Sequence, residues 1–263
     1  MTQPLSGVGS VVTVGSGKGG VGKSTVVLNL ALALTETGSR VGILDADLFA
    51  PNIPLMLNLT RKQSAAAWDI ASAERRVIDP YEQYGLKVMS SAFILGEDTP
   101  LRLDSTFVDM ILRQFLREVA WGALDVLFVD LPPGTADLQQ TVLREYPVAG
   151  ALVVVTPQDV AHLDARKVVS MVEAAKVPIL GGIENMSGAL CPHCGEPFDV
   201  FPRAPQDRTI WASGVEKLGD VPLHPSIGAT GNAGEPVFVS APDSGPAWAF
   251  RATADRLLDR LKR

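Results

Sequence analysis

The chain has 263 residues, of which 46% are hydrophobic and 20% are charged, and its formal net charge is -6 at pH 7. This length suits one large α/β domain, and the acidic balance argues against a protein that binds nucleic acid by neutralising phosphates. The sequence has no apolar run near the ~18 residues of a membrane span and no secretory signal. Its two cysteines form no disulfide framework, so we expect a cytoplasmic protein.

Apolar runs typical of buried strands alternate along the chain with amphipathic stretches typical of helices. The sequence predicts strands at 11–14, 41–47, 86–91, 124–130, 151–157 and 178–185. It predicts helices at 23–37 and 104–121, and the alternation is interrupted at 48–84 and 186–206. This order indicates a mainly parallel, twisted sheet with helices on both faces. We expect residues 1–263 to form a single ATPase domain, with a metal-binding loop inserted near 186–206.

The first strand is followed by GSGKGGVGKST (15–25), which satisfies the phosphate-loop pattern G-x-x-x-x-G-K-[ST]. Its glycines let successive backbone N–H groups turn inward as an anion nest, and the next helix points its positive end at the phosphates. We expect Lys23 to bridge the β- and γ-phosphates of ATP as a catalytic residue and Ser24 to hold Mg²⁺. The predicted nucleotide-binding residues here are Gly17, Lys18, Gly19, Gly20, Val21, Gly22, Lys23, Ser24 and Thr25.

The second strand ends in DADLFAPNIP (45–54), and its two aspartates lie two residues apart. In a strand this spacing puts Asp45 and Asp47 on one face, and at the carboxyl edge of a parallel sheet that face meets the ligand crevice. We expect Asp47 to orient the attacking water as a catalytic residue. Asp45 is expected to act through the water shell of the metal.

Three later strand ends carry polar residues suited to the same crevice. Asp130 closes an apolar run and is expected to support Mg²⁺, while the N–H of Gly134 is a candidate sensor of the γ-phosphate. Asn185 has an amide that could read the adenine edge, although a turn-forming role is an open alternative. Asp159 is expected to cap the helix that follows the strand at 151–157.

The only two cysteines lie in GALCPHCGEP (188–197), with two residues between them. Cys191 and Cys194 supply two thiolates, which is half of a four-ligand metal site. A thioredoxin-like redox pair fits less well, because no helix is expected to begin at this motif. A plain turn is the remaining interpretation, and a lone loop histidine such as His193 is more often solvated than a ligand.

The last sixteen residues, WAFRATADRLLDRLKR (248–263), have apolar side chains that fall on one face of a helix. A terminal helix packed on the sheet is the favoured interpretation. The alternative is a membrane-binding helix of a positioning ATPase, a class in which the cysteine motif has no use.

Taken together, the motifs resemble those of one group of ATPases. The loop GKGGVGKST is similar to the deviant phosphate loop of the dimeric ATPases that include septum-site and plasmid-partition proteins and the nitrogenase iron protein. The motifs in chain order resemble those of the Mrp/ApbC family of iron–sulfur cluster carriers, over roughly residues 6 to 240. They are SGKGGVGKST, DADLFAPNIP, DLPPGTADLQQT, VVTPQDVAHLDARK, IENMSG, CPHCGEPF and LGDVPLHPSI.

This resemblance implies a homodimer that ATP closes, in which Lys18 reaches the nucleotide of the partner as a catalytic residue. It also completes the half-site: the two cysteines of each chain would meet at the dimer axis and hold one bridging [4Fe–4S] cluster for delivery to apo iron–sulfur proteins. A zinc ion bridging the same four thiolates is the alternative, as a clasp in a positioning ATPase. In the nitrogenase iron protein the cysteines are widely separated, so an electron-transfer role fits less well.

The chain departs from the family pattern at several points. Ala50 and Ala136 stand where the family usually has glycine, which removes backbone freedom from both switch loops and predicts slow hydrolysis. The usual run before the long helix is missing at 99–106, so no role is transferred there. Many bacterial relatives have a small additional N-terminal domain, and because this chain begins near its first strand, we expect that domain to be absent or removed.

Overall fold

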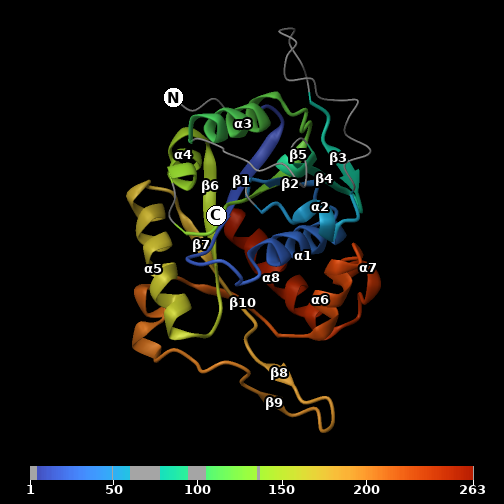
Figure 1. The fold of residues 1–263 in the computed structure, drawn as a ribbon, viewed down its shortest axis with the longest axis vertical. Helices are drawn as coiled ribbons and strands as arrows, with labels where there is room; N and C mark the ends of the chain where they lie inside the picture. Colours follow the sequence, from blue (N-terminus) through green and yellow to red (C-terminus); the bar gives the residue numbers. More distant parts are fainter. Residues whose placement is uncertain (1–4, 49, 60–77, 94–104, 135–136, 263) are drawn as a thin grey trace.

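The computed structural model describes residues 5–48, 50–59, 78–93, 105–134 and 137–262. Within these residues the main sheet has the order β10-β7-β6-β1-β5-β2-β4-β3 (Figure 1). Its neighbouring strands are all parallel except β3 and β4, as the sequence predicted. The strands are β1 (Val8–Gly15), β2 (Val41–Asp45), β3 (Tyr81–Gln83), β4 (Leu86–Ser90), β5 (Leu124–Asp130), β6 (Val148–Val155), β7 (Ile179–Asn185) and β10 (Lys217–Val221).

Helices cover both faces of this sheet (Figure 1). Alternate residues of β6 show the two layers: Leu152 and Val154 belong to the hydrophobic cluster that contains α1 and α8, whereas Val153 and Val155 pack with α5. Helices therefore lie on both sides, as expected for a parallel sheet. They are α1 (Lys23–Glu36), α2 (Ile53–Met56), α3 (Ser105–Glu118), α4 (Asp137–Glu145), α5 (Asp159–Ala174), α6 (Pro225–Asn232), α7 (Val237–Ser240) and α8 (Gly245–Leu261).

The six predicted strands and two predicted helices are present, with small differences at their ends. The first strand begins three residues earlier, and the strand predicted at 151–157 spans Val148–Val155. The predicted cap at Asp159 is wrong. Gln158 occupies the cap position in an extended conformation, and Asp159 is the first helical residue, where its carboxylate accepts from Arg208 at 2.8 Å. An acidic residue in the first turn still complements the helix dipole.

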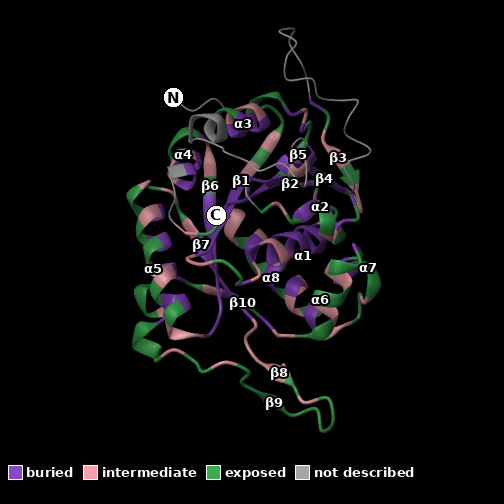
Figure 2. Ribbon diagram, viewed as in Figure 1, coloured by how far each residue is buried: buried purple, intermediate pink, exposed green. Residues whose placement is uncertain are grey.

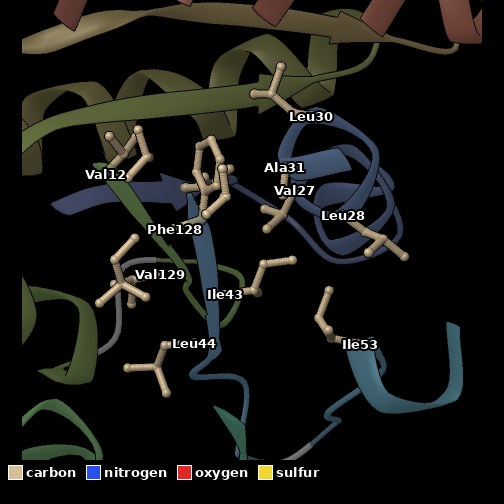
Figure 3. Packing of buried hydrophobic residues seen from close by; sticks show 14 of the residues in the cluster. Val12, Val27, Leu28, Leu30, Ala31, Ile43, Leu44, Ile53, Phe128 and Val129 are labelled. Carbon is tan, nitrogen blue, oxygen red and sulfur yellow. The ribbon is translucent and has the colours of Figure 1, made fainter. Parts of the chain in front are cut away.

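Helix α1, which follows the phosphate loop, is buried along most of its length (Figure 2). Val27 and Ala31 face the sheet side chains Ile43 and Phe128 (Figure 3). Helix α8 also packs against α1. Burying one such aliphatic side chain contributes about 1.5–3 kcal/mol. The helix is thus firmly held, and so is the loop that leads into its first residue.

The C-terminal helix α8 packs against α1 and β10, in agreement with the favoured interpretation. Phe250, Ala254 and Leu257 are buried, whereas Trp248 is 58% exposed. Among the described residues, none of the helices combines the length and the apolar character needed to cross a membrane. The apolar face of α8 therefore belongs to the core of the protein.

The strand order brings the functional residues to one edge of the sheet. Asp130 at the end of β5 is in register with Asp45 on β2 and with Val14 on β1. From β1 the chain continues to β2, which lies on one side of β1, whereas from β6 it continues to β7, which lies on the other side. The connections that follow the adjacent strands β1 and β6 therefore run in opposite directions along the sheet. Such a switch point is where open α/β sheets form their ligand crevice.

Candidate nucleotide and metal sites

The phosphate loop joins the end of β1 to α1 and has the backbone geometry of an anion nest. Gly20 and Gly22 have φ values of 79° and 78°, in the left-handed region that glycine adopts without strain. Gly22 caps α1 with no side-chain hydrogen bond, so the first N–H groups of the helix point into the loop without a capping side chain. This is the arrangement that binds phosphate at a helix N-terminus.

The loop borders a cavity of about 250 Å³ beside the sheet edge. Its walls come from the loop, from Asp47 and Ala50 after β2, and from Pro133 after β5. Of the predicted nucleotide-binding residues, those that line it are Lys18, Gly19, Gly20, Val21, Gly22, Lys23, Ser24 and Thr25. The structure thus gathers most of the predicted loop residues, and Asp47, around one hollow.

Gly17 has no room for a side chain. A Cβ atom there would lie 2.3 Å from the backbone carbon of Asp164 and 2.4 Å from the backbone nitrogen of Ala165, in α5. Gly19 has room for a side chain, because the nearest neighbour of a Cβ atom added there would be Pro133 Cγ at 4.0 Å. The phosphate loop and α5 therefore touch backbone to backbone at Gly17.

We expect Gly17→Ala to lower the free energy of unfolding by about 1–3 kcal/mol, because inserted atoms force the backbone apart. Gly19→Ala is the matched control, because it adds the same methyl group to the same loop at a position with open space. It should change stability by less than about 1 kcal/mol. Urea unfolding without nucleotide measures both, so phosphate contacts do not interfere. Equal stability of the two variants would contradict the close contact with α5.

Lys23 and Asp130 form a buried ion pair at the centre of the site. Lys23 Nζ lies 2.5 Å from Asp130 Oδ1, with side chains 6% and 0% exposed. Lys23 Nζ is also 3.5 Å from Ser24 Oγ. Burial raises the pKa of Asp130 above its usual value, against the attraction of Lys23. In this state the lysine is held by the carboxylate that was predicted to support Mg²⁺.

The residues at this point fit a magnesium ion. Asp130 Oδ2 is buried and has no hydrogen-bond partner among the described residues, which leaves one carboxylate oxygen for a ligand. Ser24 Oγ, which lies 3.5 Å from Lys23 Nζ, adds a hydroxyl beside this ion pair. Mg²⁺ prefers oxygen ligands and is usually bound through one or two protein groups plus phosphate and water.

Asp45 and Asp47 have different surroundings, although they were predicted to share a face. Asp45 is fully buried and accepts hydrogen bonds from the N–H groups of Asp47 and Ile53 and from Ser90 Oγ, each at 3.2 Å. Burial and the nearby Asp130 raise the pKa of Asp45 well above its usual value. Asp45 thus braces the loop after β2, whereas Asp47 lines the cavity.

Three predicted residues are held by hydrogen bonds within the chain. Lys18 Nζ donates to Gln158 Oε1 at 3.3 Å, and Gly134 N–H donates to the Ser16 carbonyl at 2.9 Å. Asn185 Nδ2 donates to the Val21 carbonyl at 2.8 Å. The roles assigned to these residues in trans action, γ-phosphate sensing and adenine recognition stay predictions. Of the two substituted switch residues, Ala50 lines the cavity and Ala136 lies outside the described residues.

The two cysteines lie on a separate hairpin made of β8 (Ala189–Leu190) and β9 (Pro197–Phe198), which projects from the body of the protein (Figure 1). Its turn is closed by Cys191 N–H to the Glu196 carbonyl at 2.9 Å and by Gly195 N–H to the Cys191 carbonyl at 2.8 Å. Cys194 is exposed and Cys191 is partly exposed. Figure 2 shows that most of this hairpin faces solvent.

The surroundings of the two thiols suit metal ligands. The backbone N–H groups of Cys194 and His193 lower the pKa of the Cys191 thiol, because they stabilise the thiolate. Among the described residues of one chain, no third histidine, cysteine, aspartate or glutamate joins the pair as a metal-binding group. The hairpin therefore offers two thiolates and leaves the other ligands to come from elsewhere.

Sequence reasoning missed two residues that connect these parts. Gln158 holds Lys18 and also accepts from Thr156 Oγ1 at 2.9 Å. Arg203 contacts Glu184 on β7 and both ends of the cysteine hairpin. The position of Gln158 directly before a predicted helix was a usable signal. No local pattern marks Arg203, because its partners lie up to 19 residues away.

The comparisons with known proteins agree with this arrangement. Residues 7–258 match the family model ParA, described as NUBPL iron-transfer P-loop NTPase. The chain is 40% identical over 258 residues to the iron-sulfur cluster transfer protein NUBPL of Dictyostelium discoideum, covering 98% of this chain and 78% of that protein. It is 41% identical over 251 residues to the iron-sulfur cluster carrier protein of Aquifex aeolicus, with coverage of 95% and 67%.

Among solved structures, one similar protein is the nucleotide-binding protein of Archaeoglobus fulgidus in complex with ADP. It is 35% identical, its TM-score is 0.73, and the match covers 88% of each chain. The family model spans nearly the whole sequence, including both the phosphate loop and the cysteine hairpin. The chain therefore belongs to the ParA family of NUBPL-type iron-transfer P-loop NTPases.

Proposed function

We propose that this protein is an ATPase that carries an iron–sulfur cluster and delivers it to apo-proteins. The observation that carries the proposal is the presence, in one chain, of a phosphate loop and a projecting hairpin with two cysteines, one exposed and one partly exposed. The relatives named as cluster carriers and transfer proteins support it. We regard the chain as one ATPase domain with the cysteine loop inserted, acting in the cytoplasm where thiols stay reduced.

In the proposed mechanism, ATP binding begins from the ion pair between Lys23 and Asp130. When ATP enters, Lys23 leaves Asp130 and binds the β- and γ-phosphates, which frees the carboxylate for Mg²⁺ with Ser24. The ion would neutralise developing charge on the phosphates. Asp47 then orients the attacking water from the cavity wall.

Three further residues complete the proposed nucleotide site. Lys18 leaves Gln158 and reaches the nucleotide of a second protomer, the N–H of Gly134 turns from Ser16 to the γ-phosphate, and the amide of Asn185 reads adenine. Each of these groups is already held at the edge of the phosphate loop by one hydrogen bond. A single hydrogen bond contributes about 0.5–1.5 kcal/mol, which phosphate or adenine contacts can replace.

The cluster half of the proposal is a homodimer in which each chain supplies Cys191 and Cys194. Four thiolates then hold one [4Fe–4S] cluster at the dimer axis. The exposed Cys194 and the partly exposed Cys191 favour this over an internal site, and a cluster held there is accessible to a recipient protein. Zinc bound by the same four thiolates is the alternative occupant.

The test is transfer of a cluster from the purified full-length protein. The protein is reconstituted anaerobically with iron and sulfide, freed of excess reagent, and mixed with the apo form of an enzyme that needs a [4Fe–4S] cluster. We expect enzyme activity to return faster than with equal amounts of free iron and sulfide, and the same preparation to hydrolyse ATP. Tight zinc binding with no uptake of iron would overturn the carrier function.

A further inference from the structure

The cysteine hairpin is anchored at its base by one side chain, Arg203. Its guanidinium donates through Nε to Asp199 Oδ1 at 2.9 Å, just after β9. Through Nη2 it donates to the Ser187 carbonyl at 2.5 Å, just before β8. The two arms of the hairpin are thus joined below the cysteines by a planar group whose donors point in fixed directions.

The same guanidinium reaches the sheet. Arg203 Nη1 lies 3.0 Å from Glu184 Oε1 on β7, and Lys217 Nζ lies 3.2 Å from the other oxygen of that carboxylate. The Glu184 side chain is only 4% exposed, whereas Arg203 is 47% exposed. A buried carboxylate needs such partners, because an unpaired charge in that position is costly. The buried Glu184 therefore holds the Arg203 guanidinium against the sheet.

Glu184 is next to Asn185, the residue that holds the phosphate loop. In a strand, adjacent side chains point to opposite faces, so β7 presents Asn185 to Val21 on one side and Glu184 to Arg203 on the other. Asn185 is packed tightly there, since a Cβ on Gly22 would lie 2.3 Å from Asn185 Nδ2. One strand end thus contacts the nucleotide loop and the hairpin anchor.

We infer that Arg203 is the positioning residue that couples the cysteine hairpin to the phosphate loop. Nucleotide binding thereby changes the position and the accessibility of the two thiols. A displacement of the Val21 carbonyl moves Asn185 and the end of β7. Because Glu184 lies on the same strand end, it moves as well and displaces Arg203 and the base of the hairpin. The inference rests on the proposed function for its purpose, but the coupling itself is a property of the apo-protein. Arg203 touches neither the phosphate loop nor the cysteines.

The experiment measures alkylation of the thiols by a maleimide in the cluster-free protein, with and without a non-hydrolysable ATP analogue. In the natural sequence we expect the analogue to change the alkylation rate of Cys191 and Cys194 by at least about threefold. Arg203→Gln should abolish this difference while ATP affinity stays within about twofold. Arg203→Lys keeps a charge for Glu184 but lacks the forked donors, so it should restore little of the difference.

Arg208→Gln is the matched control, because Arg208 lies in the same segment and pairs with the exposed Asp159, away from the hairpin. It should keep the full nucleotide response. If Arg203→Gln retains that response, the coupling is wrong, and so it is if the natural protein shows no response although it binds the analogue. Neither result requires a cluster, so failure of the carrier function is recognised separately, by absence of iron uptake and transfer.

Discussion

Lys23→Ala is expected to lower ATP hydrolysis by at least about 100-fold, the usual effect of removing one group that stabilises developing charge. The same change should destabilise the nucleotide-free protein by about 3–5 kcal/mol. It leaves Asp130 as a charge without its buried partner, which is the costly way to break such a pair. Steady-state phosphate release and urea unfolding, measured on the same preparation, check the two effects.

Asp130→Asn in the Lys23→Ala background separates the two effects. The amide carries no charge, so the double variant should regain most of the lost stability, yet hydrolysis should stay as low as in Lys23→Ala. Cluster loading should be less affected than hydrolysis in both variants, because the cysteines lie on a separate hairpin. Equal loss of hydrolysis and loading in the stable double variant would count against separate sites.

The sequence was sufficient for the parts of the site that follow from local pattern. The phosphate loop is a continuous motif, and apolar runs such as 124–130 place Asp130 at a strand end without knowledge of the packing. Parallel strands end at a common edge, so Asp45 and Asp130 could be brought together by reasoning alone. The hairpin was expected only as a loop, because two-residue strands leave no recognisable periodicity.

The remaining features depend on which segments meet in three dimensions. Asn185 reaches Val21 across 164 positions, and Lys23 reaches Asp130 across 107. The sequence placed Asp45 and Asp47 on one face, whereas packing holds the first against Ser90 and leaves the second at the cavity. The neighbours that each side chain contacts, and not residue type, separate the two aspartates.

Cys191→Ala is expected to remove the cluster completely. After anaerobic reconstitution the natural protein should hold about four iron and four sulfide per two chains, and the variant close to none, because a four-iron cluster needs four thiolates. His193→Ala is the matched control in the same turn and should keep the iron content. An unchanged iron content in Cys191→Ala would remove the cysteines from the site.

Mixed dimers decide whether the site is shared between two chains. If each chain contributes two thiolates, a dimer of one natural chain and one Cys191→Ala, Cys194→Ala chain has half a site and should hold almost no four-iron cluster. If each hairpin instead completed its own site with external ligands, the mixed dimer would keep half of the iron. Two differently tagged chains, purified over both tags before reconstitution, give this dimer, and its iron and sulfide content distinguishes the two arrangements. The cysteine pair is at least partly exposed and has no third protein ligand among the described residues, which favours the first outcome.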